Sequence, residues 1–196
     1  MPRITLPSLS RLKDRAKRFS DDTGGTLSVE TVFAAPLLFW CIMAMFVYFE
    51  AFRTQAQNTK AAYVVADILS REQSTLTTEY INSLHQTQKY MTPNGADHKL
   101  NVTQIFYRKN KDDYRRNWSV ARGGAGRHSN NSVNKIPNLP PIKPGDKMIM
   151  VEATVGYKPL FNAGITNNIW LRTRAFTRSR IAADKGVGCK WKAGCR

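Results

Sequence analysis

The sequence contains few of the residues from which catalytic centres and metal sites are built. Its 196 residues include three cysteines and three histidines, and no two cysteines have the Cys-x-x-Cys spacing of a zinc site. His85, His98 and His128 lack metal-ligand spacing and are interpreted as surface residues. Because no nucleophile, base or metal set can be assembled, we expect no enzyme, no metal and no cofactor.

Acidic residues are also scarce. The chain has 14 Asp and Glu against 30 Lys and Arg, a formal net charge of +16 at pH 7. Such an excess suits nucleic acid, an anionic membrane surface or an acidic partner, and charge alone does not choose among them. Near the C-terminus, four arginines are expected to share one strand face that is either solvated or in contact with an anionic partner. They are Arg172, Arg174, Arg178 and Arg180.

Charge is absent from residues 31–49. As a helix this run would span roughly 28 Å, close to the thickness of the hydrocarbon core of a bilayer. Six Lys and Arg precede the run, so the positive-inside rule places the N-terminus in the cytoplasm and residues 50–196 outside. A cleaved secretory signal would have a shorter apolar region of about 7–15 residues. A buried core helix would have a polar face.

Glycine is absent from residues 26–71, and proline occurs there once, at Pro36. We therefore predict one continuous helix of roughly 70 Å. Past the apolar run, apolar residues recur every three to four positions on one face that includes Phe52 and Tyr63. A second face consists of Ala62, Val65 and Leu69. The predicted parts are a basic leader (1–25), a transmembrane helix (26–49), a helical stem (50–71) and an extracytoplasmic domain (72–196).

The second half of the chain changes to the period of two that is typical of strands. In residues 147–159, Ile149, Val151 and Val155 fall on one face, which predicts a half-buried strand. Other predicted elements are strands at 98–109, 115–122 and 169–180, a helix at 77–91, and a long Gly-, Asn- and Pro-rich loop at 123–145. Such loops are usually functional or disordered. We predict an α+β fold, with the stem helix packed on an antiparallel sheet of three to four strands.

One carboxylate, Glu30, lies at the N-terminal edge of the apolar run. An isolated carboxylate costs about 2.5 kcal/mol or more at the centre of a bilayer and less near its edge. Glu30 could extend its carboxylate to water. Alternatively, it could stabilise the positive end of the helix dipole, with Thr26 or Ser28 as the N-cap.

The residues around Glu30 also resemble a known family. The string Gly25-Thr26-Leu27-Ser28-Val29-Glu30, between a basic leader and an apolar helix, resembles the processing region of type IV prepilins and pseudopilins. Within this class it is most similar to the TadE-like family, minor pseudopilins of the tight-adherence (Flp) pilus. The similar positions are Gly25, Val29, Glu30, Phe33, Pro36, Leu37 and Leu38, with a looser match at Val155, Tyr157, Pro159 and Leu160.

The resemblance implies a pilin-like fold and a non-enzymatic role in assembling a surface pilus. A prepilin peptidase would cut after Gly25, so that Thr26 becomes the first residue and Glu30 the fifth. The Glu30 carboxylate would then pair with the Thr26 ammonium of a neighbouring subunit, and both charges would leave water together. The implied partners are other pilins and pseudopilins, inner-membrane pilus assembly proteins and the peptidase. The implied location is the bacterial inner membrane, with the bulk of the chain in the periplasm or in a pilus.

Two other classes of protein remain open. The chain could be an unprocessed single-pass membrane protein whose basic exported domain binds an anionic polymer, a lipid or nucleic acid. It could also be a membrane-tethered nucleic-acid binder, although an exported domain would not meet genomic DNA, so we do not expect nucleic acid as a partner. Cleavage after Gly25 separates the pilus component from the unprocessed protein.

Two of the three cysteines, Cys189 and Cys195, lie close together near the C-terminus. In an oxidising compartment they are expected to form a disulfide. Two free thiols or an intermolecular bridge are the alternatives. Cys41 lies inside the apolar run and is interpreted as a small packing residue.

Overall fold

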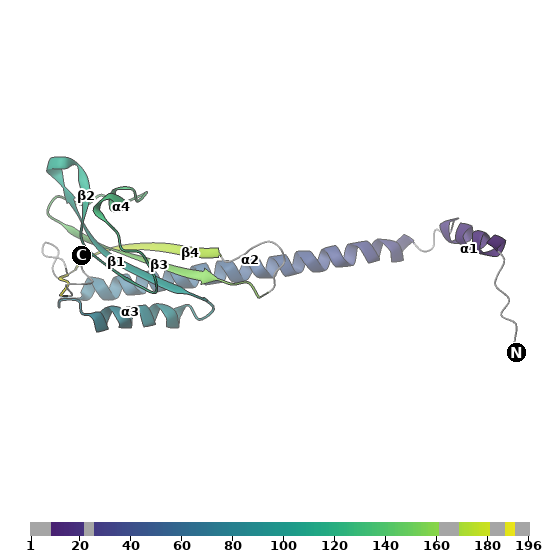
Figure 1. Ribbon diagram of the computed structural model, residues 1–196, viewed down its shortest axis with the longest axis horizontal. Coiled ribbons are helices and arrows are strands. Elements are labelled where there is room, and N and C mark those ends of the chain that lie inside the picture. The colour runs from purple at the N-terminus through teal and green to yellow at the C-terminus, as the bar shows by residue number, and fades with distance from the viewer. Residues whose placement is uncertain (1–8, 22–25, 161–168, 181–186, 191–196) are drawn as a thin grey trace. The chain divides into compact units, whose positions relative to one another are not determined.

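The computed structural model describes residues 9–21, 26–160, 169–180 and 187–190 of the chain. The chain divides into two compact units, Met1–Met45 and Phe46–Arg196, which are described separately below. Figure 1 shows the order of the elements along the chain.

The first unit contains helix α1 (Leu9–Asp21) and the beginning of helix α2 (Thr26–Arg71). Helix α2 has 46 residues and includes Pro36, so the continuous helix predicted over residues 26–71 is confirmed. Helix α1 was not among the predicted elements. It lies within the basic leader.

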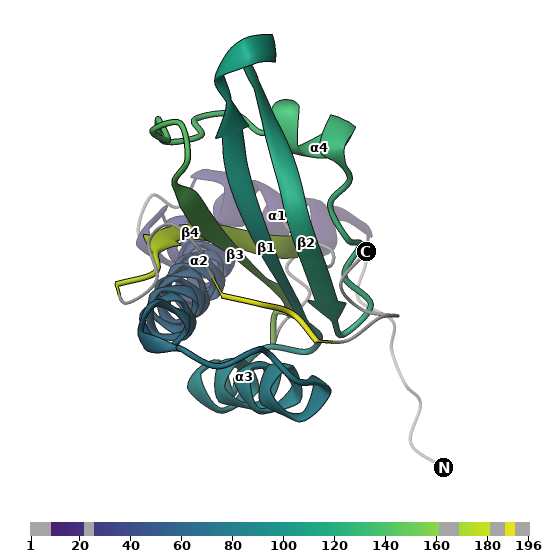
Figure 2. The ribbon, with the colours of Figure 1, turned by 90° about the vertical axis from the view of Figure 1, so that its left-hand side faces the viewer.

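The second unit contains a four-stranded antiparallel sheet (Figure 2). Its strands are β1 (His98–Arg108), β2 (Asp113–Arg122), β3 (Lys147–Tyr157) and β4 (Ile169–Arg178). They lie in the order β2-β1-β3-β4. A short 3₁₀ turn, η2 (Lys109–Lys111), joins β1 to β2. The α+β fold class and the antiparallel sheet are therefore confirmed.

The C-terminal part of α2 and helix α3 (Thr78–Met91) cover one face of the sheet (Figure 2). Of the two stem faces in the sequence, Ala62, Val65 and Leu69 are buried against the sheet, whereas Phe52 and Tyr63 are exposed. Complete burial of a leucine or valine side chain contributes about 1.5–3 kcal/mol. The core on this face includes Leu76, Ile81, Leu84, Leu100, Val102, Trp118, Val120, Ile149, Val151 and Ala153.

A buried amide also ties α2 to the sheet. Asn58 is fully buried, and its Nδ2 donates to the carbonyl oxygens of Ala153 at 3.0 Å and Leu171 at 3.2 Å. Buried polar groups are costly unless they are hydrogen-bonded. These bonds therefore favour one position of the helix along β3 and β4.

Part of the second face of the sheet is covered as well. Strand β3 is buried along nearly its whole length, so the predicted half-buried strand is wrong. The covering segment is the long loop predicted at 123–145, which contains the short helix α4 (Asn130–Asn134). Its apolar side chains form a second core with the sheet, consisting of Ile105, Val133, Ile136, Ile142, Met148 and Met150.

The same loop covers part of the outer edge of β2. The backbone N–H of Tyr114 donates to Asn134 Oδ1 at 2.8 Å, and the N–H of Arg116 donates to Asn130 Oδ1 at 3.0 Å. Two side-chain amides thus take the place of a neighbouring strand, because edge N–H groups otherwise remain available for pairing.

Candidate functional site

Helix α2 carries a long exposed apolar surface. Among the described residues there is one helix, over residues 28–71, that is long and apolar enough to cross a membrane. Its large side chains in the first unit are exposed where a core helix would bury them. They are Val29, Val32, Phe33, Leu37, Leu38, Phe39, Trp40, Ile42 and Met45. An exposed apolar patch of this kind marks a membrane or protein contact.

Glu30 lies at the N-terminal end of this surface. It is exposed and has no ion-pair partner in the described part of the chain. A shallow hollow beside it is lined by Thr31, Ala34, Ala35 and Leu38. Of the two residues at the predicted processing site, Thr26 is the first residue of α2, and Gly25 lies outside the described residues.

The four arginines predicted to share a strand face do not all do so. Strand β4 ends at Arg178, and Arg180 lies beyond it, where its guanidinium approaches Asp67 of α2 at 3.3 Å. The shared face is therefore wrong for Arg180. Arg178 pairs with Asp146 at 3.3 Å. Each of these arginines thus has a carboxylate nearby, which reduces the charge available to a partner.

Arg172 and Arg174 converge on one carboxylate, that of Glu152 on β3. Glu152 is 8% exposed, and its oxygens lie 2.9 Å from Arg174 Nε and 3.3 Å from Arg172 Nε. His128 Nε2 lies 3.5 Å from a Glu152 oxygen, which is longer than the usual N–H···O hydrogen bond. Burial alone would raise the pKa of Glu152, but contacts with His128, Arg174 and Arg172 outweigh it and lower the pKa to about 2. Glu152 is therefore ionised at neutral pH.

Replacing Glu152 by glutamine should lower the free energy of unfolding at pH 7 by about 2 kcal/mol, because charge-assisted hydrogen bonds are lost. Since the folded-state pKa of about 2 lies below the ordinary value of 4.5, the stabilisation is present above pH 4.5. It is lost as the pH falls toward 2.

Urea unfolding at pH 7 and pH 3 should show a smaller acid destabilisation for Glu152→Gln than for the unmodified chain. Asp146→Asn, which removes a more exposed carboxylate, should cost less than about 1 kcal/mol at pH 7. Equal acid destabilisation of both variants would contradict the role of Glu152.

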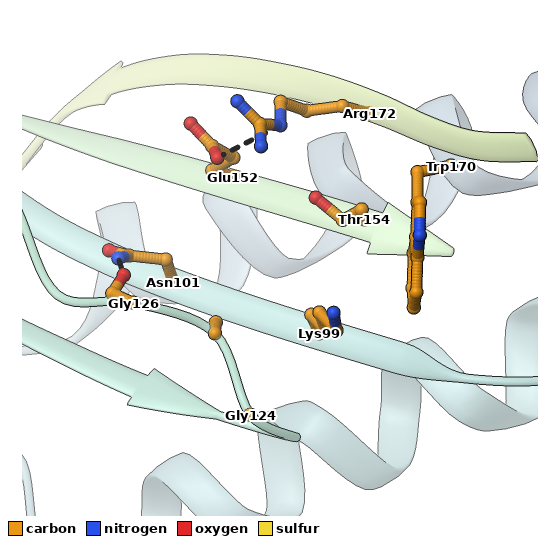
Figure 3. Close-up of a pocket in the computed structure, with 9 residues that line it drawn as sticks. Lys99, Asn101, Gly124, Gly126, Glu152, Thr154, Trp170 and Arg172 are labelled. Atoms are coloured by element: carbon orange, nitrogen blue, oxygen red, sulfur yellow. Dashed lines mark hydrogen bonds and ion pairs between the residues drawn. The ribbon is translucent and has the colours of Figure 1, made fainter. Parts of the chain in front are cut away.

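Glu152 forms part of the lining of a pocket of about 280 Å³ on the sheet face opposite α2 (Figure 3). Side chains from three strands meet there, and the backbone of residues 124–126 closes one side. Asn101 Nδ2 donates to the carbonyl oxygen of Gly126 and so holds this loop against β1. The side chains that line the pocket are Lys99, Asn101, Glu152, Thr154, Trp170 and Arg172.

Two cations flank the pocket in one row across the sheet. Lys99 on β1 pairs with Thr154 on β3, which in turn pairs with Arg172 on β4. The Lys99 ammonium lies 3.7 Å from the centre of the Trp170 ring, a cation–π contact. Strand β3 lies between the backbones of Lys99 and Arg172, and neighbouring strands are about 4.8 Å apart. The row presents hydrogen-bond donors to the pocket.

The histidines are not simple surface residues. His85 is buried, with Nε2 2.9 Å from the carbonyl oxygen of His98, and His98 Nε2 lies 2.9 Å from the carbonyl oxygen of Thr92. His128 faces Glu152. The interpretation as a surface residue is therefore wrong for His85, whereas His98 and His128 are half-buried. Within the described ranges, no group of three or more His, Cys, Asp or Glu side chains is placed to hold a metal ion.

The cysteines differ in state. Cys189 is disulfide-bonded, and Cys41 has a free, exposed thiol. The predicted partner of Cys189, Cys195, lies outside the described residues. Next to Cys189, the backbone N–H of Leu76 donates to the carbonyl oxygen of Gly188 at 2.9 Å. Residues 187–190 are thereby held beside the segment that precedes α3.

Comparisons with known proteins identify no relative. No protein-family model, no curated protein and no solved structure matches the chain. The functional argument therefore depends on the residues and geometry described above.

Proposed function

We propose that the protein is a non-enzymatic, membrane-anchored pseudopilin-like component that assembles a surface pilus of the tight-adherence type. The observation that carries the proposal is Glu30, an exposed carboxylate on the exposed apolar surface of α2 that has no ion-pair partner among the described residues. In a lone membrane helix this charge is a cost. In a bundle of parallel helices, the ammonium of a neighbouring subunit would compensate it.

The fold supports this proposal. Helix α2 continues without interruption from the apolar run into the segment that packs on the sheet. A single element can therefore anchor the chain and carry the exported domain. The small side chains Ala34 and Ala35 beside Glu30 leave room for another helix to approach closely. In this proposal the N-terminus is cytoplasmic and the sheet domain lies outside the inner membrane.

The N-terminal sequence of the protein purified from its native host tests the proposal. We expect the mature chain to begin at Thr26, after removal of residues 1–25 by a prepilin peptidase. Gly25→Leu should block the cut, because the leader of the prepilins that this chain resembles ends in Gly, and the leader should remain attached. A native chain that retains residues 1–25 in cells that assemble pili would contradict the proposal.

A second candidate function is an unprocessed, membrane-anchored protein with a binding domain. The pocket beside Lys99 and Arg172 favours it, because this donor-rich site is not needed for helix assembly. N-terminal sequencing of the native protein distinguishes the two candidates, because only the pilus component would begin at Thr26. Nucleic acid is not proposed as the partner, because an exported domain would not meet genomic DNA.

A further inference from the structure

The pocket beside Lys99 lies close to the end of the apolar run, within the second unit. The Tyr157 hydroxyl donates to the carbonyl oxygen of Val47 at 3.0 Å, so the end of β3 is level with the last residues of the uncharged run. Thr154 is three residues along β3 from Tyr157, a distance of roughly 10 Å. The polar zone of a bilayer extends about 5–8 Å beyond the hydrocarbon on each side. Lys99 is therefore within side-chain reach of lipid headgroups, and Arg172 lies in the same row of the sheet, with its guanidinium turned toward Glu152.

The pocket is lined by two cations, Lys99 and Arg172, and one carboxylate, Glu152, so its net charge is positive. Lys99 has no carboxylate within ion-pair distance in the described part of the chain. Arg172 shares the Glu152 carboxylate with Arg174, and its side chain is 57% exposed. Ammonium and guanidinium groups are donors only. Together with the Thr154 hydroxyl, they would satisfy several oxygens of a phosphate group.

Apolar and basic side chains at the same end of the sheet are suited to an interface. Leu160, just beyond β3, is 73% exposed, and Trp170 is 47% exposed. Tryptophan is enriched where membranes meet water. Lys158 is also exposed. Besides Glu152 in the pocket itself, the nearby acidic groups are Glu50, which lies 3.7 Å from Arg53, and Asp97, in an adjacent hollow.

We propose that this pocket binds the phosphate of an anionic phospholipid at the outer surface of the membrane that α2 crosses. Lys99 and Arg172 bind the phosphate oxygens from two sides, and Thr154 donates between them. Glu152 holds Arg172 in place without filling the pocket. The inference rests on the membrane anchoring in the proposed function, and it requires neither cleavage after Gly25 nor a pilus.

Native mass spectrometry of the full chain, in a non-ionic polyoxyethylene detergent, tests this inference. We expect tighter retention of phosphatidylglycerol than of phosphatidylcholine. Lys99→Gln and Arg172→Gln should each weaken phosphatidylglycerol binding about tenfold, the loss expected for one charged contact. Lys99→Arg should retain most of the binding. Arg178→Gln is the matched control, because it removes the same charge from the same face of β4 but lies outside the pocket lining.

Three results would overturn the inference. Equal losses in Arg178→Gln and Lys99→Gln would show that net charge alone attracts the lipid. Equal retention of both lipids would show that no anionic headgroup is recognised. Lys99-dependent binding of inorganic phosphate without preferential lipid binding would assign the pocket to a free oxyanion. Circular dichroism of each variant shows whether its fold is retained.

The lipid-binding inference and the proposed function can be contradicted separately. Carbonate extraction of native membranes reports whether the chain is anchored, and the N-terminal sequence reports processing. An anchored but uncut chain would contradict the pilus role and leave the lipid site standing. A chain that is cut after Gly25 but shows no lipid preference would contradict the lipid site and leave the pilus role standing.

Discussion

Glu30→Gln should leave membrane insertion and processing unchanged and reduce pilus assembly about tenfold or more. The substitution retains the size and most of the hydrogen bonding of the side chain, but it removes the charge that would neutralise the Thr26 ammonium of a neighbour. Loss of about 1.4 kcal/mol at each subunit contact weakens association about tenfold. Counting pili by electron microscopy at native expression, together with N-terminal sequencing, measures both parts of this expectation.

Glu50→Gln is the matched control. It removes a carboxylate from the same helix just past the apolar run, where Glu50 accepts a hydrogen bond from Asn94 and lies near Arg53. Pilus numbers should stay near normal in this variant. Normal pili in Glu30→Gln cells would instead favour a carboxylate that extends to water or stabilises the helix end.

The pairing also has a geometric consequence. Thr26 and Glu30 are four residues apart, about 6 Å along a helix. A neighbour whose Thr26 meets Glu30 must therefore be displaced by about one helical turn. Assembly through this contact would set one axial step between adjacent subunits.

Gly123→Ala should be strongly destabilising. Gly123 has φ +66°, and a Cβ built there would lie 1.9 Å from the carbonyl oxygen of His98. The positive φ costs an alanine about 1–2 kcal/mol, and the backbone clash adds about 1–3 kcal/mol. We expect a total near 3 kcal/mol and a fall in Tm of about 10 °C, since 1 kcal/mol shifts Tm by about 2–4 °C in a chain of this size. Thermal unfolding of the full chain in detergent measures the shift.

The neighbouring glycine provides the control. Gly124 has φ +74°, but nothing lies within 4 Å of a Cβ built there. Gly124→Ala should therefore lower the free energy of unfolding only by the cost of the positive φ, about 1 kcal/mol. If both variants unfold at the same temperature, the close approach of Gly123 to β1 does not limit stability.

The sequence carries enough local information to predict the main elements. Residues 26–71 form one helix because they contain no glycine and only an early proline, and the strands follow from their period of two. The burial of both faces of β3 was not predicted. Val133, Ile136 and Ile142 lie in a proline-rich segment without regular spacing, so their packing against the sheet has no periodic signal.

The pocket was missed for a related reason. Lys99, Thr154 and Arg172 are far apart in the sequence and come together only through the pairing of β1, β3 and β4. Pairing register depends on tertiary packing and turn geometry. The alternating arginines near the C-terminus were a partial signal, but their acidic partners Glu152, Asp146 and Asp67 lie on other elements. The alternating pattern alone therefore overestimates the positive charge that these arginines offer to a partner.

The two asparagines that cover the edge of β2 affect how readily the protein aggregates at high concentration. Exposed strand edges are templates for cross-β aggregation between copies. Along β2, the N–H groups of Tyr114 and Arg116 are already bonded to Asn134 and Asn130. Concentrated preparations should therefore resist fibre growth from this edge. Deamidation of either asparagine during storage would replace its side-chain amide with a carboxylate and add negative charge beside β2.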